Sequence, residues 1–318
     1  MRELVKKMST NSKILDAIFN EGERLVPGET HDRDEVVRHK SSYQLFRDVI
    51  ESDILRDPSM LASGFTILDI GCGTGHGTFM LSDILGAQIV GIDPSIESVQ
   101  YAKDNYFAKN VQYVNGDAES FVRESRLFDY VVSRHALEHV LDGLNFALKV
   151  DCRKRLMVNV PFNEGDGNVH HLVHWIKEEQ FEAYPNKEFF YEGLDGVTEL
   201  TRTEDNPPNS IICVSSAPEL KPVHELFEFP IAAWKPEFLQ NLGIKVLETD
   251  LNQRETWVVE KESQLESRES QIEEREAELT AKGTEVAQRE AELTRDVQQY
   301  NSLLLIRIFH ILKRVMKL

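Results

Sequence analysis

A glycine-rich loop that directly follows an apolar run restricts the fold of this chain more than any other feature. The segment is "LDIGCGTGHG", residues 68–77, and its glycines form the pattern G-x-G-x-G two residues after Asp69. Glycine allows tight turns and lets a ligand lie close to bare backbone. A dinucleotide loop, G-x-G-x-x-G, would need glycine at His76, and a P-loop would need Gly-Lys-Ser/Thr. The loop therefore predicts a strand–loop–helix unit that holds some other ligand.

The region around this loop alternates strand-like and helix-like segments. Two helical patterns, "GTFMLSDILG" and "SIESVQYAKDNY", separate apolar runs between residues 65 and 160. The predicted strands there are "FTILDI", "AQIVGID", "VQYVNGD", "DYVVSRH" and "RLMVNVP". This alternation is typical of a doubly wound, mostly parallel sheet of the Rossmann-like α/β class. The runs "SIICVSS" and "IKVLETD" would complete a seven-stranded sheet, which binds ligands beyond the carboxyl ends of its strands.

The loop "DIGCGTGHG" resembles the first motif of class I S-adenosylmethionine (SAM) methyltransferases, and "IVGIDPS", "VNGDAES" and "SRHALEHV" follow in that family's order. The resemblance implies SAM as the cofactor. It implies that Asp69 meets the cationic methionine end of SAM, that Asp93 accepts the ribose hydroxyls and that Asp117 lies at the adenine. The full set of cofactor-binding residues that it implies is Asp69, Gly71, Gly73, Gly75, Asp93, Pro94, Asp117, Ala118 and Arg134.

The segment "HALEHV" resembles the "E-x-x-E-H" segment of ubiquinone-type O-methyltransferases, in which acids and a histidine can hold a divalent ion. Here His135 replaces the first acid and precedes Glu138 and His139. On a helix these three residues would share one face. Three roles stay open for them: ligation of a divalent metal, removal of a proton from an acceptor hydroxyl, and packing of a helix end. We place all three among the catalytic residues and expect no resident metal, because the first acid is missing.

A histidine-rich segment, "PFNEGDGNVHHLVHW", follows the fifth predicted strand, where the acceptor of the methyl group should bind. Its histidines are His170, His171 and His174. Because no fourth ligand is evident, acceptor binding or general base catalysis suits them better than zinc, and His171 is the catalytic candidate. Glu164 and Asp166 would orient sugar hydroxyls, and Trp175 would stack on a sugar face. The alternative is a solvated loop with incidental histidines.

The N-terminal part, residues 1–60, precedes a methyltransferase domain predicted over 61–257. Its segment "GERLVPGETHDRDEVVRHKSSYQLF" is similar to the lead-in of bacterial surface-glycan methyltransferases and would form a lid over the SAM pocket. The opening "MRELVKKMSTNSKIL" lacks the apolar stretch of a signal peptide. The three cysteines are scattered and form no C-x-x-C pair, which is typical of reduced thiols in a cytoplasmic protein.

A composition shift after Val259 marks a different kind of structure. Apolar residues recur every seven positions through an otherwise charged segment, and "REAELT" occurs twice. The recurring residues are Leu265, Ile272, Leu279, Val286 and Leu293, followed by Tyr300. This period predicts a coiled-coil stalk over 258–300 and a homo-oligomer, although the second seam position holds Glu269, Glu276, Gly283 and Glu290. The alternative is a solitary charged helix with pairs such as Glu285–Arg289.

Residues 301–318 have the pattern of a basic amphipathic helix. Arg307, His310, Arg314 and Lys317 fall on one helical face, and the opposite face is apolar. The segment is too short and too charged to span a bilayer. It would lie on an anionic membrane surface or dock on another protein, such as a glycosyltransferase. The protein would then be cytoplasmic and peripheral on the inner face of the cytoplasmic membrane.

Together these features predict a SAM-dependent methyltransferase that acts on a hydroxyl. The expected acceptor is a sugar of a bacterial surface polysaccharide or of a lipid-linked glycan. A net charge of −18 argues against a nucleic-acid substrate. Two alternatives stay open: an O-methyltransferase for a small molecule or a quinone, and a non-catalytic SAM-fold scaffold on an oligomerising stalk.

Overall fold

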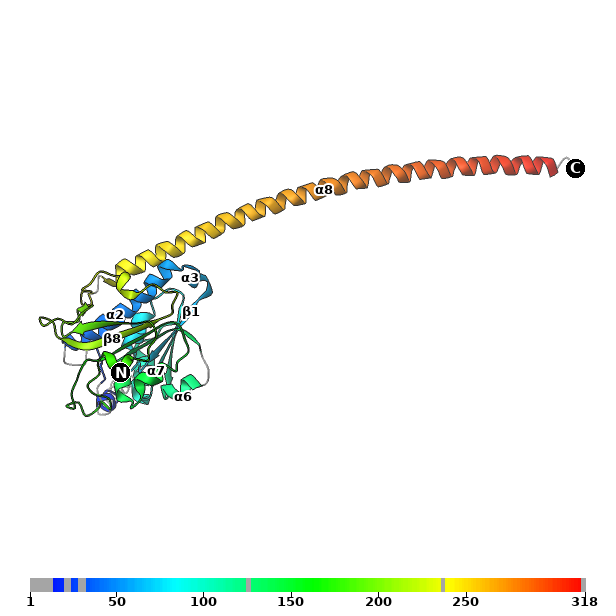
Figure 1. Cartoon of the computed structure of the whole chain (residues 1–318). Coiled ribbons are helices and arrows are strands. Elements are labelled where there is room, and N and C mark those ends of the chain that lie inside the picture. The colour runs from blue at the N-terminus through cyan, green and yellow to red at the C-terminus, as the bar shows by residue number, and fades with distance from the viewer. Residues whose placement is uncertain (1–13, 20–23, 28–32, 124–126, 236–237, 316–318) are drawn as a thin grey trace, which may run out of the picture. The chain divides into compact units, whose positions relative to one another are not determined.

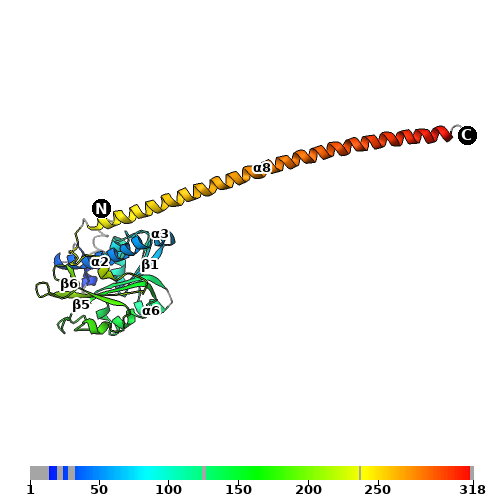
Figure 2. The same cartoon turned by 45° about the horizontal axis from the view of Figure 1, so that its top comes forward.

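The computed structural model describes residues 14–19, 24–27, 33–123, 127–235 and 238–315, and structural statements refer to these ranges. The chain divides into two compact units, Met1–Leu251 and Asn252–Leu318. In the first unit, helices cover both faces of one sheet (Figures 1 and 2). The second unit is the greater part of one long helix.

One eight-stranded sheet forms the centre of the first unit, with the strand order β3-β2-β1-β4-β5-β8-β6-β7. Its strands are β1 (Phe65–Ile70), β2 (Ala87–Asp93), β3 (Val111–Asn115), β4 (Phe128–Arg134), β5 (Cys152–Pro161), β6 (Lys187–Gly193), β7 (Thr198–Glu199) and β8 (Pro208–Ser216). The strands from β3 to β5 are parallel, whereas β8, β6 and β7 pair antiparallel with their neighbours. The strand order reverses between β1 and β4, and ligands of such sheets bind in the crevice at that point.

The predicted Rossmann-like α/β class is confirmed, but two predictions about its strands are wrong. The described residues contain eight strands, whereas the sequence predicts seven. The sequence pattern does not predict β6 or the short β7. The run "IKVLETD" lies inside helix α8 (Phe238–Val315) and not in the sheet. A short apolar run suits a strand and a buried helix equally well when periodicity is the only guide.

Helices pack on the two faces of the sheet through separate hydrophobic clusters. The helices of the first unit include residues 14–19, the first residues of α8, and α2 (Arg33–Arg56), α3 (Ser59–Ser63), α4 (His76–Leu81), α5 (Ile96–Asn105), α6 (Ala118–Arg123) and α7 (Gly143–Ala147). On one face, Phe46 of α2 and Leu81 of α4 join Ile67 of the sheet in one cluster. On the other face, Leu144 and Phe146 of α7 belong to the second cluster. Figure 2 shows α2 and α3 on one side of the sheet and α6 on the other.

Helix α2 is fixed to the amino end of β5 by a buried ion pair. Arg155 donates from Nε and Nη2 to the two carboxylate oxygens of Asp53, both at 2.8 Å, and both side chains are almost fully buried. The Tyr130 hydroxyl donates to the same carboxylate at 3.2 Å. Because a buried charge is costly without its partner, this pair determines where the end of α2 lies on the sheet.

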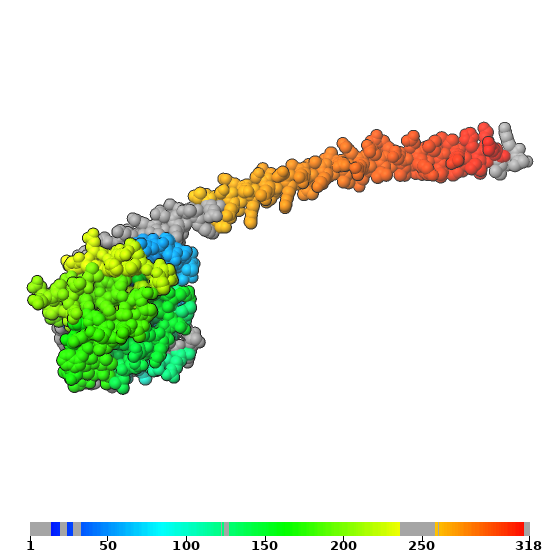
Figure 3. All heavy atoms as spheres, in the orientation of Figure 1, coloured from blue at the N-terminus to red at the C-terminus, as the bar shows by residue number. Residues whose placement is uncertain are grey.

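Helix α8 holds 78 residues, which corresponds to about 117 Å at 1.5 Å per residue. Its side chains from 261 to 314 are exposed, the apolar ones included, and Figure 3 shows this part as a single rod from orange to red. Among the described residues, no helix has an apolar stretch long enough to span a membrane. The coiled-coil stalk and the membrane-surface helix remain predictions, and Lys317 lies outside the described residues.

Candidate active site

A cavity of about 1040 Å³ opens at the carboxyl ends of β1, β2, β4 and β5. Pockets for one small molecule usually measure about 300–1,000 Å³, so this cavity has room for a cofactor and part of a second molecule. The predicted cofactor residues that line it are Gly71, Gly73, Asp93, Pro94, Asp117, Ala118 and Arg134. The predicted catalytic residues His135, His139 and His171 line it as well. One cavity therefore holds most residues of both predicted sets, but not Asp69, Gly75 or Glu138.

The glycine loop between β1 and α4 brings bare backbone to this cavity. Gly73 has a φ of 51°, and a Cβ added to it would meet no atom within 4 Å, so a ligand can lie against it. Gly75 is different. It has a φ of 86°, and a Cβ there would lie 2.5 Å from the Ala102 Cβ and 2.9 Å from the Tyr113 ring. Gly75 thus allows close packing of the loop and does not line the cavity.

Asp69 lies beneath the cavity rather than in its wall, where the sequence predicts a contact with the cationic end of SAM. Its carboxylate is fully buried and accepts hydrogen bonds from the Thr78 hydroxyl at 2.6 Å and from the Tyr43 hydroxyl at 3.1 Å. Burial raises the pKa of Asp69 to about 7, although the two hydrogen bonds act in the opposite direction. Asp69 therefore joins β1 to α2 and α4 and does not line the cavity.

Asp93, the last residue of β2, lies in the cavity wall as predicted. Its Oδ2 accepts a hydrogen bond from the Gly73 amide and its Oδ1 from the Ser95 amide, both at 2.9 Å. Arg24 Nη2 lies 3.7 Å from Oδ1. A carboxylate has about four acceptor positions, so the same group can also receive hydrogen bonds from the two hydroxyls of a ribose.

Asp117 and Ala118 lie in the cavity wall where β3 is followed by α6. The Asp117 carboxylate accepts hydrogen bonds from the amide and the hydroxyl of Ser120, and these bonds hold its pKa below the usual value. Because an acid at this place caps the helix, the first turn of α6 has a fixed position. The cap thus sets one end of the cavity.

Arg134 ends β4 and brings a cation to the cavity. Its Nε donates to the Ser42 hydroxyl at 3.2 Å, and its Nη2 donates to Glu35 at 3.3 Å. Ser42 donates in turn to Glu192, a fully buried residue whose pKa is raised by burial to about 7. These contacts with α2 and β6 hold the guanidinium in place, and an anionic group of a ligand suits it chemically.

His135 does not form the predicted group with Glu138 and His139. Residues Leu137–His139 form a single 3₁₀ turn, so the spacing of an α-helical face is not available. His135 has a φ of 47°, and its Nε2 lies 2.9 Å from the Ser210 hydroxyl of β8. Burial, helped by nearby Arg134, keeps the pKa of His135 well below its usual value. His135 is therefore a neutral part of the wall and a poor candidate for a base.

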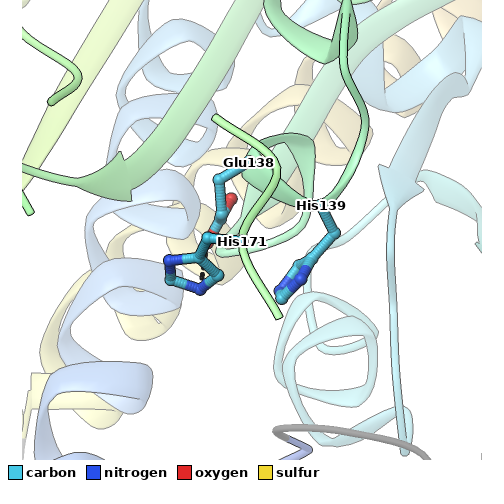
Figure 4. A group of neighbouring side chains, drawn as sticks. All are labelled: Glu138, His139 and His171. Atoms are coloured by element: carbon cyan, nitrogen blue, oxygen red, sulfur yellow. Dashed lines mark ion pairs between the residues drawn. The ribbon is translucent and has the colours of Figure 1, made fainter. Parts of the chain in front are cut away.

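Glu138 and His139 instead meet His171, which comes from the loop after β5 (Figure 4). One possible ligand atom from each residue lies within 4.8 Å of the others, and His171 Nε2 is 3.9 Å from a Glu138 carboxylate oxygen. The two imidazole rings lie edge to face, with centroids 4.8 Å apart. The Glu138 carbonyl accepts hydrogen bonds from the amides of Leu172 and Val173, which hold the two segments together.

The partners of the two imidazoles determine which nitrogen carries the hydrogen. His139 Nδ1 lies 2.9 Å from the His170 carbonyl oxygen, which can only accept, so Nδ1 is the donor. His171 Nδ1 lies 2.5 Å from a Glu164 carboxylate oxygen, and the Asn168 amide nitrogen lies 3.2 Å from Nε2. Both rings then keep their lone pair on Nε2. Such nitrogens can take up a proton or, together with a carboxylate, ligate a divalent ion.

Comparison with known proteins identifies methyltransferases as relatives of this chain. Residues 67–157 match the model of a methyltransferase domain. The mitochondrial ubiquinone biosynthesis O-methyltransferase of Rattus norvegicus is 36% identical over 99 residues, which are 29% of this chain and 28% of the rat protein. Residues 67–157 thus form a methyltransferase domain.

Other relatives of the methyltransferase domain carry different names. Phosphoethanolamine N-methyltransferase 1 of Zea mays is 31% identical over 84 residues, which are 26% of this chain and 17% of the maize protein. The chain thus spans less than a third of the length of these curated relatives. Among solved structures, a SAM-dependent methyltransferase from Archaeoglobus fulgidus covers 54% of this chain and 94% of its own, at 15% identity and a TM-score of 0.37. Glu164 and His171 lie beyond the range that the family model matches.

The structure places the other predicted acceptor residues unequally. Glu164 lines the cavity, whereas His174, Asp166 and Trp175 do not. The His174 ring lies beside His171, with centroids 6.4 Å apart. The Trp175 indole donates to Asp166 at 3.1 Å, outside the cavity. A sugar bound in the cavity would therefore meet Glu164 and would not stack on Trp175.

Several residues that line the cavity are not predicted from the sequence. They are Glu35, His39 and Tyr43 of α2, with Thr74 and His76 near the glycine loop. Burial lowers the pKa of His76 to about 4, so this ring is neutral at pH 7. One sequence pattern could have indicated these residues. Polar side chains such as Glu35, His39 and Ser42 recur at helical spacing on a helix that also carries core residues.

The described part of the predicted lid, residues 24–27, touches the glycine loop. The Thr74 hydroxyl donates to the Leu25 carbonyl at 2.6 Å, and both Arg24 and Leu25 line the cavity. Residues 20–23 and 28–32 of the same segment lie outside the described residues. The lid function stays a prediction.

Proposed function

We propose that the protein transfers the methyl group of SAM to a hydroxyl of an acceptor bound at the β4–β5 end of the cavity. The observation that carries this proposal is the single cavity that Gly73, Asp93 and His139 share. The residues suit SAM: open backbone at Gly73, a carboxylate for a diol at Asp93, and a capped turn at Asp117. When bound, SAM supplies an electrophilic methyl group, so the protein mainly aligns the acceptor and removes its proton.

His139 is the general base in this proposal. Its Nδ1 donates to the His170 carbonyl, so Nε2 is the nitrogen that accepts a proton. As the acceptor oxygen bonds to the methyl carbon, the carbon–sulfur bond breaks, its electron pair stays on sulfur, and Nε2 takes the hydroxyl proton. The Glu138 carboxylate, in the same cluster, stabilises the imidazolium that results. His171, oriented by Glu164, completes the polar wall beside the acceptor.

The acceptor in this proposal is a sugar hydroxyl of a surface polysaccharide or a lipid-linked glycan. The β5 end of the cavity is lined by Glu164, Asn168 and Asn209, and by the ring of Phe162. Carboxylate and amide groups form paired hydrogen bonds with neighbouring hydroxyls, and an aromatic ring covers the apolar face of a sugar. A small phenol or a quinone derivative is the second candidate, favoured by the name of the rat relative.

The C-terminal segment supports an acceptor at a membrane. Residues 303–314 contain Arg307, Lys313 and Arg314 but no acid, and they expose apolar side chains such as Leu305 and Phe309. Basic amphipathic helices of this composition lie in anionic lipid surfaces. The protein is then peripheral on the inner face of the cytoplasmic membrane, where lipid-linked glycans are within reach. Docking of this segment on a glycosyltransferase is the alternative.

The test is methyl transfer from labelled SAM by the full-length chain to lipid-linked glycan extracts, nucleotide sugars, phenols and quinols. We expect label in the glycan fraction. His139→Ala should lower kcat by about 10²–10⁴-fold and leave the affinity for S-adenosylhomocysteine unchanged, because His139 acts on the acceptor proton. His174→Ala is the matched control, since His174 lies outside the cavity, and it should keep the wild-type rate.

Three results would change the proposal. Label in the phenol or quinol fraction alone would establish the second candidate. Binding of SAM without transfer to any acceptor would favour the scaffold. EDTA should leave the rate unchanged, and a loss of rate that a divalent ion restores would replace the base role of His139 with metal ligation by Glu138, His139 and His171.

A further inference from the structure

A row of exposed apolar side chains runs along helix α8 at a spacing of seven residues. Its members are Val258, Leu265, Ile272, Leu279, Val286, Leu293 and Tyr300. Their exposed fractions lie between 44% for Val258 and 68% for Leu279 and Tyr300. A helix that is otherwise charged and polar does not need such a row for its own stability. The constant spacing of seven residues is that of a seam between helices.

The charges beside this row are as regular as the row itself. A basic residue stands three positions after each apolar residue in five consecutive heptads: Lys261, Arg268, Arg275, Lys282 and Arg289. The position after each base holds, in the same order, Glu262, Glu269, Glu276, Gly283 and Glu290. Two further acids, Glu266 and Glu273, directly follow members of the apolar row. One side of the row is therefore basic and the other acidic.

We propose that α8 pairs with the α8 of a second copy of this chain, parallel and in register, over residues 258–304. In heptad terms the apolar row occupies position d, the bases position g and the acids positions a and e. Parallel helices bring position g of one chain beside the e and a positions of the next heptad in the other. Lys261 then meets Glu266 of the second copy, and Arg268 meets Glu273 and Glu269 of the second copy.

The charges also select against the antiparallel arrangement. Antiparallel helices place g beside g, which would align the five bases with one another, and they place e beside e. Like charges at such positions destabilise a pair of helices. In the parallel arrangement the glutamates at position a face one another across the seam, and the basic residue that precedes each of them on the other chain offsets part of this cost.

The composition of the seam favours two chains. Each heptad from 265 to 293 contributes one apolar residue to the seam, so each helix has a narrow apolar stripe that a single partner helix covers. Position a becomes apolar at Val297 and Leu304. We therefore expect the two helices to pair more strongly there than in the earlier heptads. Beyond it, Arg307 and Arg314 take position d, and the seam ends where the basic amphipathic segment begins.

Orientation is tested by oxidative cross-linking of the full-length chain. Leu265→Cys should form a disulfide-linked dimer with itself, because parallel, in-register helices bring the two substituted positions together. Ser267→Cys, on the outer face of the helix, is the matched control and should not cross-link. The wild-type chain gives the background from Cys72, Cys152 and Cys213, of which the first and last are buried. A link from Leu265→Cys to Leu293→Cys in a mixture, without self-linking of either, would overturn the proposal.

Stoichiometry and charge are tested by light scattering across protein concentrations from about 1 to 100 µM. We expect twice the chain mass of 36.5 kDa for the wild type and the chain mass for Leu279→Asp. Arg275→Glu should raise the dissociation constant about tenfold at low salt, and Arg275→Glu with Glu276→Arg should restore it. A wild-type monomer or trimer, or a double variant no tighter than the single one, would overturn the proposal. Methyl transfer is not needed for any of these measurements.

Discussion

The two halves of the cavity are built in opposite ways. The half that we propose for SAM, the cofactor half, comes from successive strand ends, with Gly73 after β1, Asp93 at the end of β2 and Asp117 after β3. The half that we propose for the acceptor, the acceptor half, is assembled from the loops that follow β4 and β5, with His139 in the first and His171 in the second. Strand topology alone positions the first half, whereas loop conformation positions the second. The cofactor can therefore stay constant among proteins of this fold while the acceptor changes.

Removing the Asp93 carboxylate should weaken the binding of SAM in the cofactor half and leave the acceptor half of the cavity unchanged. Asp93→Ala takes away the acceptor of the Gly73 amide and the group that we propose for the ribose hydroxyls. We expect a loss of about a thousandfold in affinity for SAM and S-adenosylhomocysteine, measured by isothermal titration. Asp93→Asn keeps one oxygen and should lose less, and NAD should bind to none of these proteins. Unchanged affinity in Asp93→Ala would remove the ribose from this place in the cavity.

Two alanine substitutions in the glycine loop should separate packing from ligand contact. Gly75→Ala should lower the free energy of unfolding by about 2–3 kcal/mol, because the added methyl meets Ala102 and Tyr113 in a left-handed backbone. Gly73→Ala meets no atom and should cost about 1 kcal/mol, yet it should weaken SAM binding about tenfold because the methyl enters ligand space. Urea unfolding and titration measure the two effects. Equal destabilisation by both would contradict the packing described for Gly75.

The smallest expected effect concerns Asp69, which supports the cofactor half from beneath. Burial raises its pKa from 3.8 to about 7. Between these pH values the folded chain binds a proton that the unfolded chain does not, so the free energy of unfolding falls as pH rises through this window. Asp69→Asn should reduce that slope in urea unfolding. Asp48 and Glu192, whose pKa values burial also raises to about 7, should keep part of it.

Glu278→Gln removes the same charge from an exposed position of α8 and is the control for Asp69→Asn. It should leave the dependence of unfolding on pH as in the wild type. If Asp69→Asn and Glu278→Gln give the same curve as the wild type, Asp69 is not the buried group that the structure describes.

Much of the fold can be predicted from the sequence because the parallel strands are buried on both faces. Such strands appear as continuous apolar runs, as in "FTILDI" and "DYVVSRH". Strand β6, "KEFFYEG", does not, since it carries Lys187, Glu188 and Glu192. Glu192 is nevertheless fully buried, where it accepts a hydrogen bond from Ser42 of α2. A buried acid with a distant partner has no local pattern that would reveal it.

The residues of the candidate site also divide into those that the sequence predicts and those that it does not. The places of Asp93 and Asp117 in the cavity wall can be predicted because both residues stand at strand ends. The burial of Asp69 cannot, because its donor Tyr43 belongs to another element. The group of Glu138, His139 and His171 cannot either, since it depends on a 3₁₀ turn and on the loop after β5. For this reason helical spacing groups His135, and not His171, with Glu138 and His139, although His171 is predicted separately as a catalytic residue.

The buried pair of Asp53 and Arg155 has a consequence for the cavity at the other end of α2. Glu35 and His39 line the cavity 14–18 residues before Asp53, which is about 20–27 Å along a helix. An α-helix of this length is stiff, so a small tilt at Asp53 changes how far Glu35 and His39 reach toward a ligand. We therefore expect substitutions at the amino end of β5 to change the affinity for the cofactor, although they alter no residue that lines the cavity.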